Sequence, residues 1–293
     1  MKDTGLIIVD KPVGPTSHSV VNLVRKGTKI RKVGHAGTLD PRASGVLVLC
    51  LGAATRLSEY LSTSSKCYEA VIRFGSSTRT FDSDGEVTRR TGLSPELKQV
   101  QALLPQFVGE IAQVPPPYSA IKVRGRKAYE MARAGEEVEL EPRKVVIHSL
   151  AVKDYKAPDL ALTVECSAGT YIRSLAHDLG ERVSTGAHLT GLRRTRAGPF
   201  QLQEAIALPK LEVAFLTGKW DQYVRPAADA LPEFPAVRVD AQAVEQLRFG
   251  HRIAAEPGST GMAKALGPDG ELVAILEAVD GGQMWHPRKV FLG

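Results

Sequence analysis

The sequence is poor in cysteine and has no long apolar run. Its three cysteines, Cys50, Cys67 and Cys166, are far apart and odd in number, which indicates neither a disulfide framework nor a zinc site. The longest apolar run, residues 46–51, is far shorter than the roughly 20 residues of a membrane-spanning helix. The apolar stretch 6–9 is too short for a signal peptide. We therefore expect a cytoplasmic protein that does not contact a membrane.

Motifs that mark several enzyme classes are absent as well. The sequence contains neither G-x-G-x-x-G nor G-x-x-x-x-G-K-[ST], which disfavours nucleotide-cofactor chemistry. The nucleophile elbow G-x-S-x-G of serine hydrolases does not occur either. His35 and Asp40 have no third candidate ligand nearby, and His177 with Asp178 is an isolated pair that we expect at a surface or a helix cap. We therefore predict no cofactor and no metal.

What the sequence does contain is a globular composition with an uneven distribution of charge. Apolar residues make up 43% and charged residues 24%, a balance that permits a sizeable core. The net charge is +6, but residues 22–42, 120–133 and 193–196 together hold +12, which leaves −6 on the rest of the chain. A basic surface on an otherwise acidic body indicates a polyanionic partner.

Hydrophobic patterns and turn residues predict an α+β protein. Alternating or buried apolar runs predict strands, and amphipathic patterns after capping residues or proline predict helices. An extended basic arm is expected after the prolines at 115–117, and a small β-rich domain in the last segment of about sixty residues, from strand signals at 237–239, 272–278 and 290–292. The other predicted strands are 5–9, 46–51, 66–74, 145–152 and 160–166, and the predicted helices are 17–26 (after Thr16 or Ser17), 53–61, 94–104 and 171–183, with 76–92 a loop and 189–200 a strand pair or turn.

The glycine-rich segment 34–45 is the most unusual part of the sequence. Its three glycines permit backbone angles that other residues avoid, and they surround His35, Asp40 and Arg42. A carboxylate on such a loop, between a basic stretch and a buried strand, is suited to act as a nucleophile or a base. The simpler alternative is that Asp40 and Pro41 only start a turn.

Two further side chains each have a functional and a structural interpretation. Arg173, near the start of the helix predicted at 171–183, either orients a catalytic carboxylate through charge-assisted hydrogen bonds or lies on a solvated helix face. Tyr68 shares one strand face with apolar residues, so it either packs in the core or stacks on a base.

Five motifs together resemble the bacterial tRNA pseudouridine synthase B (TruB) family. They are Leu-Ile-Ile-Val-Asp-Lys-Pro-Val-Gly at 6–14, Gly-His-Ala-Gly-Thr-Leu-Asp-Pro at 34–41, Lys-Cys-Tyr at 66–68, Pro-Pro-Tyr-Ser-Ala at 116–120 and Gly-Thr-Tyr-Ile-Arg at 169–173. The resemblance implies the α+β pseudouridine synthase fold, with a mixed, mainly antiparallel central sheet flanked by helices and loops. It also implies a catalytic domain at 1–230 with an RNA-binding insert at about 115–145, and a small β-rich, PUA-like RNA-binding domain at 235–293.

The activity that the resemblance implies is the cofactor-free isomerisation of uridine 55, in the TΨC arm of tRNA, to pseudouridine. Asp40 is then the catalytic nucleophile, which attacks C1′ of the ribose or C6 of the base, or promotes elimination to a glycal. Arg173 pairs with Asp40, and Tyr68 stacks on the uracil and is a candidate for proton transfer at C5, although a phenol with a pKa of about 10 is a poor base at neutral pH. The other residues carried over are Lys11, which supports the loop, Tyr171 and Leu192, which line the pocket, and Asp82, whose role stays open.

The resemblance also implies how RNA is bound. A uridine in a folded loop must be flipped out of its stack at a cost of a few kcal/mol, and His35 suits the task of filling the gap. We expect tRNA, through its TΨC stem-loop, as the only partner of a monomer that needs no guide RNA or protein. The basic residues expected to contact the phosphates are Lys122, Arg124, Arg126, Lys127, Arg193 and Arg194.

Two rival functions stay open at this stage. A non-catalytic protein that binds or remodels tRNA on the same scaffold would not need Asp40, and a tRNA-folding role can also accompany catalysis. A carboxylate-based nucleoside glycosidase would need an acid and a base on the two sides of the bond and would release free uracil.

Overall fold

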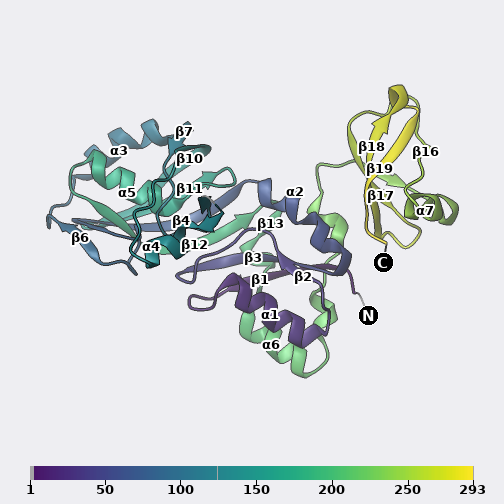
Figure 1. The fold of residues 1–293 in the computed structure, drawn as a ribbon, viewed down its shortest axis with the longest axis horizontal. Coiled ribbons are helices and arrows are strands. Elements are labelled where there is room, and N and C mark those ends of the chain that lie inside the picture. The colour runs from purple at the N-terminus through teal and green to yellow at the C-terminus, as the bar shows by residue number, and fades with distance from the viewer. Residues whose placement is uncertain (1–2, 124, 293) are drawn as a thin grey trace. The chain divides into compact units, whose positions relative to one another are not determined.

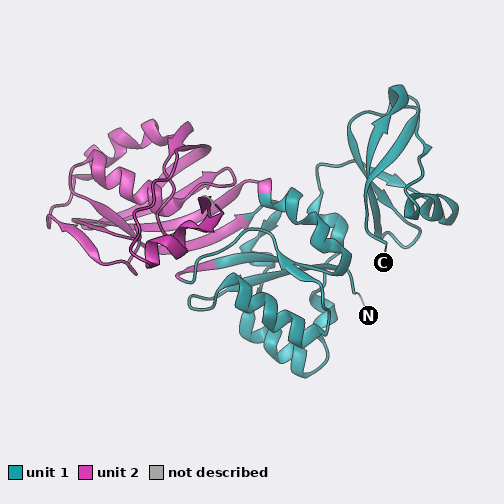
Figure 2. Cartoon of the chain, in the orientation of Figure 1, with its two compact units in different colours: residues 1–41, 45–62, 197–293 teal, residues 42–44, 63–196 magenta. Residues whose placement is uncertain are grey.

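The computed structural model describes residues 3–123 and 125–292, and the chain divides into two units (Figure 2). Unit 1 comprises residues 1–41, 45–62 and 197–293, and unit 2 comprises residues 42–44 and 63–196. Among the described residues, no helix has the length and apolar character that crossing a bilayer requires. Sheets and helices occur in both units, as the predicted α+β class requires (Figure 1).

Buried strands at the start of the chain form the centre of unit 1. β1 (Gly5–Lys11) runs antiparallel to β3 (Ala43–Leu51) and parallel to the short β14 (Ile206–Ala207), while β2 (Val33–His35) pairs with β3. Residues 46–51 are all buried, because a strand covered on both faces has no polar side to present. The strands predicted at 5–9 and 46–51 are therefore confirmed.

The helices of unit 1 begin at recognisable caps. α1 (Ser17–Thr28) begins after Thr16, whose hydroxyl accepts from the Ser19 N–H at 3.0 Å, and this confirms the predicted helix and selects Thr16 as its cap. α6 (Leu208–Leu216) packs against α1. In place of one helix at 53–61, a 3₁₀ helix η1 (Gly52–Leu57) leads into α2 (Ser58–Thr63).

The C-terminal part of unit 1 is a five-stranded sheet around its own apolar core. The strand order is β15 (Ala236–Arg238), β17 (Met262–Leu266), β18 (Leu272–Val279), β19 (Met284–Val290), β16 (Ile253–Ala254), and α7 (Ala241–Arg248) packs beside it. The strand predicted at 290–292 was wrong, because the last strand ends at Val290. Pro287 hid this strand from prediction, since proline lacks a donor; the register shifts beside it, as at a β-bulge.

The last strand is tied to the body of unit 1 by side chains from η1 and α2. The Arg56 guanidinium donates to the Val290 carbonyl, and Lys289 pairs with Glu59 and lies 5.5 Å from the centre of the Tyr60 ring. These contacts combine an ion pair, a hydrogen bond from a side chain to a backbone carbonyl and a cation–π interaction on one short strand segment. The predicted domain boundary at 230–235 stays a prediction.

Unit 2 is built on a second set of strands, in the order β12 (Ala187–Ala197), β4 (Lys66–Phe74), β11 (Asp159–Cys166), β10 (Arg143–Lys156), β7 (Gly109–Gln113). The pairs β4–β11, β11–β10 and β10–β7 are antiparallel. The strands predicted at 66–74, 145–152 and 160–166 are confirmed, although β10 is longer at both ends. Residues 187–197 form one continuous strand, followed by the two-residue β13 (Phe200–Gln201).

The helices and hairpins of unit 2 depart from prediction at their ends. α3 (Leu97–Leu103) begins later than predicted, because Glu96 and Gln99 form a capping box. α5 (Ile172–Arg182) matches the predicted helix and packs against β4. The predicted loop at 76–92 contains a hairpin of β5 (Ser76–Thr78) and β6 (Val87–Arg90), and the basic arm holds β8 (Lys122–Val123), β9 (Arg126–Lys127) and α4 (Ala128–Arg133).

Candidate active site

Asp40 lies in unit 1, on a loop whose backbone is held on both sides of it. The Ser17 hydroxyl donates to the Leu39 carbonyl at 3.0 Å and accepts from the Leu39 N–H at 2.8 Å. The Gly14 N–H donates to the Pro41 carbonyl at 2.8 Å. Ser17 and Leu39 are buried, so water does not compete for their hydrogen bonds. The half-buried Asp40 therefore sits on a preorganised backbone rather than on a free turn.

A buried lysine supports the turn that holds this loop. Lys11 is fully buried at the end of β1, and its Nζ donates to the carbonyls of Pro12 at 2.8 Å and Pro15 at 2.9 Å. Gly14, between them, has a φ of 117°, a value that favours glycine. Because Gly14 in turn donates to the residue after Asp40, Lys11 supports the carboxylate's loop indirectly.

His35 ends β2 and lies opposite Leu49 of β3. The start of β2 is fixed by the Arg25 guanidinium, which donates to the Val33 carbonyl at 2.7 Å. His35 is half-buried, five positions before Asp40 in the same unit. Arg25 thus stabilises the fold from within the basic stretch 22–42.

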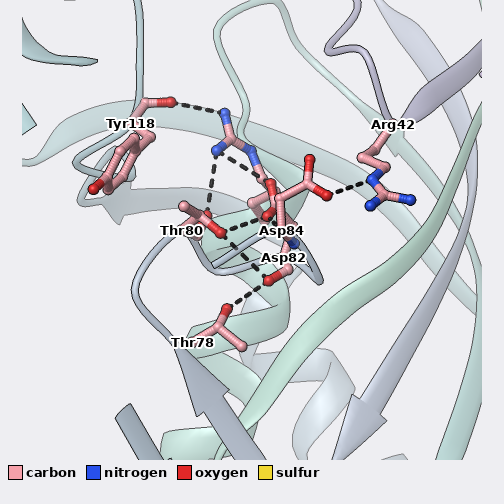
Figure 3. A network of polar contacts seen from close by, with 7 residues as sticks. Arg42, Thr78, Thr80, Asp82, Asp84 and Tyr118 are labelled. Atoms are coloured by element: carbon pink, nitrogen blue, oxygen red, sulfur yellow. Dashed lines mark hydrogen bonds and ion pairs between the residues drawn. The ribbon is translucent and has the colours of Figure 1, made fainter. Parts of the chain in front are cut away.

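Arg173 lies in unit 2, in the first turn of α5, and is only 7% exposed. Its guanidinium donates to the Thr80 carbonyl at 3.2 Å and to the Tyr118 carbonyl at 3.1 Å, and it lies 3.5 Å from the Asp82 carboxylate. Figure 3 labels these three partners, Thr80, Asp82 and Tyr118. A buried charge requires this kind of pairing, and the pairing fixes the orientation of the guanidinium.

The loop between β5 and β6 fixes Asp82 in turn. Thr80 Oγ1 donates to Asp82 Oδ1, and the Asp84 N–H donates to the same oxygen at 3.0 Å. Thr78 Oγ1 donates to the Asp82 carbonyl at 2.6 Å, and Arg42 forms an ion pair with Asp84 (Figure 3). Asp82 is therefore an ordered partner of Arg173 rather than only a turn former.

Sequence reasoning missed three members of this network, Thr78, Thr80 and Tyr118. Tyr118 lies in the motif at 116–120, but it serves through its carbonyl, which no side-chain pattern reports. The threonines alternate with Asp82 at positions 78, 80 and 82, and this spacing was the one available signal. Hydroxyl groups two and four residues before an aspartate can bond to it locally, as they do here.

The remaining predicted pocket residues also lie in unit 2. Tyr68 is buried on β4 opposite Val164, and Leu192 is half-buried on β12. Tyr171 caps the start of α5, where its N–H donates to Gln113 Oε1 at 2.8 Å and its carbonyl accepts from Gln113 Nε2 at 3.1 Å. The Gln113 amide thus fixes the entry to the helix that carries Arg173.

The structure therefore brings the predicted residues together in two groups. Lys11, His35 and Asp40 belong to unit 1, whereas Tyr68, Asp82, Tyr171, Arg173 and Leu192 belong to unit 2. Hydrogen bonds hold the Lys11 side chain and the backbone beside Asp40 in unit 1, and the Arg173 side chain and the Tyr171 backbone in unit 2. The predicted pairing of Asp40 with Arg173 stays a prediction.

The predicted phosphate-binding residues of the arm differ in what they offer. Lys122 is exposed on β8, while Arg126 forms an ion pair with Glu136 through hydrogen bonds of 2.9 and 3.0 Å. Lys127 is half-buried, with its Nζ 3.3 Å from the Tyr129 hydroxyl. Arg124, also predicted, lies outside the described residues.

The two arginines predicted on β12 differ in exposure. Arg193 is half-buried and donates to the Ser44 hydroxyl at 3.2 Å. Arg194 is only 1% exposed, so this structure does not present it at the surface. Burial, together with the charge of Arg194, lowers the pKa of Lys66 to about 8, which places both cations in one electrostatic environment.

The expected surface or cap position of His177 and Asp178 is only partly met, because both residues are half-buried. The His177 ring stacks on Phe81, with centroids 3.9 Å apart and planes 8° apart, because the β5–β6 loop covers α5 there. Burial lowers the pKa of His177 and raises that of Asp178 to about 6. Among the described residues, no three His, Cys, Asp or Glu side chains gather closely enough to hold a metal ion.

Solved structures of the same fold cover nearly all of the chain. One is described as "Structure of H/ACA RNP bound to a substrate RNA containing 2'-deoxyuridine", with a TM-score of 0.75 and 27% identity over 99% of this chain and 85% of that chain. Another, "Crystal Structure of a Cbf5-Nop10-Gar1 Complex", has a TM-score of 0.75 and 29% identity with the same coverage. The predicted pseudouridine synthase fold is thereby confirmed.

Sequence comparisons agree over the whole length. Residues 25–172 match the model of the TruB family pseudouridylate synthase N-terminal domain, 173–231 that of the tRNA pseudouridylate synthase B C-terminal domain, and 234–292 that of the tRNA pseudouridine synthase II C-terminal domain. The tRNA pseudouridine synthase B of Thermobifida fusca (strain YX) is 45% identical over an alignment of 299 positions that covers 99% of each chain. That of Solibacter usitatus (strain Ellin6076) is 43% identical, covering 98% of this chain and 99% of its own. The chain therefore belongs to the TruB family of pseudouridylate synthases.

Proposed function

We propose that the protein isomerises uridine 55 in the TΨC arm of tRNA to pseudouridine. The observation that carries the proposal is the match, over 98–99% of the chain, to proteins named tRNA pseudouridine synthase B. The names of these bacterial relatives support tRNA as the substrate, and we propose in addition that the protein acts as a monomer in the cytoplasm without guide RNA or protein partners.

The proposed reaction is an isomerisation that conserves atoms and electrons, so it consumes no oxidant, reductant or co-substrate, and we propose that it proceeds without a cofactor. The bond between N1 and C1′ breaks and a bond between C5 and C1′ forms. C5 loses its proton, and N1 gains a proton. Asp40 supplies the nucleophile, by attack at C1′, by attack at C6, or by promoting a glycal route. Its braced backbone supports this role, because a nucleophile held near the attack geometry avoids the entropy of finding it.

The unit 2 residues receive and orient the base in this proposal. Arg173 keeps the Asp40 carboxylate ionised and oriented, and its own fixed guanidinium supports that task. Tyr68 stacks on the uracil and is the candidate for proton transfer at C5. Tyr171 and Leu192 line the pocket, and Asp82 holds Arg173 in place.

In this proposal the target uridine reaches the site by base flipping, and basic side chains hold the RNA. His35 fills the space that the flipped uridine leaves, and exposed basic residues contact the phosphates. Lys122 is exposed for this contact, whereas Arg126, which is also exposed, must share its charge with Glu136. The buried Arg194 is assigned no direct phosphate contact.

The test is to incubate the protein with an unmodified tRNA transcript and no additions, then to map pseudouridine by carbodiimide-stop sequencing. A single new stop at position 55 is expected, together with tritium release from C5-labelled uridine. Pseudouridine at another position would correct the substrate. Release of free uracil, or no reaction with tRNA bound, would replace the proposal by a glycosidase or a non-catalytic tRNA-binding protein.

A further inference from the structure

α5 presents two successive turns to the tip of the β5–β6 loop. Arg173 and His177 are four residues apart, so their side chains lie on the same face of the helix. Arg173 contacts the two residues on either side of Phe81, namely the Thr80 carbonyl at 3.2 Å and the Asp82 carboxylate at 3.5 Å. The Phe81 ring itself stacks on His177. The loop tip is thus bound by the Arg173 guanidinium on one turn of α5 and by the His177 ring on the next turn.

The backbone at Phe81 adopts a conformation that is unfavourable for phenylalanine. Its φ is 63°, in the left-handed region that bulky L-residues rarely adopt. The Leu189 N–H donates to the Phe81 carbonyl at 3.0 Å, and the Ser83 N–H donates to the Leu189 carbonyl at 3.0 Å. These bonds hold the main chain of the tip, but only the His177 stack holds the Phe81 side chain among the described ring contacts.

His177 contributes a neutral aromatic face to this arrangement. Burial lowers its pKa, against the opposing charge of Glu181, and its Nδ1 is buried without a hydrogen-bond partner among the described residues. The planes of the two rings are 8° apart, so the contact is made face to face. What the loop uses is therefore the ring of His177 rather than its charge or its hydrogen bonds.

We propose that His177 is a positioning residue, which acts through Phe81 to set the place of the Asp82 carboxylate and so the orientation of the Arg173 guanidinium. This inference rests on the proposed function, in which Arg173 serves Asp40. Loss of the stack frees Phe81 to leave its left-handed conformation, and Asp82, as the next residue, moves with it. A displacement of about 1 Å at such a partner is enough to slow a reaction by ~100-fold.

The experiment compares His177→Ala with His177→Phe, using the full-length chain and an unmodified tRNA transcript. We expect His177→Ala to lower the single-turnover rate of pseudouridine formation by ~10- to 100-fold, with tRNA affinity within about twofold of the unaltered protein. His177→Phe, which keeps a ring, is expected to restore the rate to within about threefold. The exposed His148, on β10 of the same unit, gives the control variant His148→Ala, whose rate is expected to be unchanged.

Coupling to Asp82 separates positioning from general destabilisation. If His177 acts through Asp82, the double variant Asp82→Asn with His177→Ala is no slower than Asp82→Asn alone. Should His177→Ala fail to fold, Phe81→Leu removes the stack from the other side, with Phe81→Tyr as its ring-retaining partner, and the same pattern of loss and rescue is expected.

The outcomes keep this inference apart from the proposed function. An unaltered protein that forms no pseudouridine overturns the proposed function. An active protein whose His177→Ala and Phe81→Leu variants keep the full rate overturns the positioning role alone. The positioning role is also overturned if His177→Phe does not restore the rate that His177→Ala loses. It is overturned as well if the double variant is slower than Asp82→Asn by the full factor that His177→Ala costs alone.

Discussion

At the scale of single residues, the loop that carries the carboxylate proposed to react is held by side chains that bond to its backbone and to the turn beside it. The Ser17 hydroxyl is both donor and acceptor to the Leu39 backbone, and the Lys11 ammonium group donates to two backbone carbonyls. Such buried groups contribute to catalysis through the geometry that they impose. Their removal therefore changes rate and stability together, by amounts that the hydrogen bonds set.

Ser17→Ala tests this geometry. The change leaves the N–H and carbonyl of buried Leu39 without their partner, which costs about 1–3 kcal/mol of unfolding free energy. We expect in addition a rate of pseudouridine formation lowered ~10-fold, because the backbone beside Asp40 loses the Ser17 anchor. Urea unfolding and single-turnover assays measure the two effects. Ser19→Ala, an exposed hydroxyl on the same helix, is the control, and an equal loss there would contradict the account.

Asp178 predicts a stability that depends on pH. Burial raises its pKa to about 6 from an ordinary value of 3.8, so between these values the folded form binds a proton that the unfolded form releases. Stability is therefore lost as the pH rises from about 4 to 6, and Asp178→Asn should remove this loss. The variant is expected to be more stable at pH 7, by at most about 3 kcal/mol, and no more stable at pH 4. Urea midpoints at the two pH values decide the matter, and an equal difference at both would be evidence against burial as the cause.

At the scale of elements, the packing of α6 against α1 depends on a close approach of the two helices at a residue with low helix propensity. Gly27 lies near the end of α1, where an added Cβ would lie 2.2 Å from the Phe215 ring of α6. A glycine inside a helix normally costs about 1 kcal/mol relative to alanine. Here that cost permits α6 to pack against α1.

Gly27→Ala is accordingly expected to destabilise the protein, by about 1–3 kcal/mol, although alanine is the better helix former. Thermal or urea unfolding measures the change. The double variant with Phe215→Leu, which removes the ring that obstructs the new methyl group, should recover most of the loss. A stabilised Gly27→Ala protein would show that the two helices do not meet as described.

At the scale of the whole molecule, local patterns predicted the elements, whereas long-range contacts decided the site. The strand at 66–74 and the helix at 171–183 carry their own periodicity, and both are found. The stack of His177 on Phe81 was not predicted, because Phe81 is far away in the sequence and in a left-handed conformation that no sequence pattern indicates. The strand at 284–290 was missed because Pro287 argues against it locally, while pairing with β18 overrides that preference.

The charge pattern makes a prediction at this same scale. If the basic stretches contact several phosphates, tRNA affinity should fall by a hundredfold or more between about 50 and 200 mM salt. Lys122→Ala should reduce the slope of log affinity against log salt by about 0.9, and Arg126→Ala by less, because Glu136 already neutralises Arg126. Filter binding across a salt series measures both. A flat dependence would contradict the proposed RNA-binding surface.

The central claim is that Asp40 does the chemistry on a tRNA that the rest of the protein binds. Its most direct test is Asp40→Asn, which keeps the size and hydrogen-bonding reach of the side chain while removing its charge and nucleophilicity. Single-turnover pseudouridine formation and tRNA binding are measured side by side on the same transcript. The account predicts no detectable pseudouridine with an affinity within a fewfold of the unaltered protein. Pseudouridine formed by the Asn variant at the unaltered rate would contradict it.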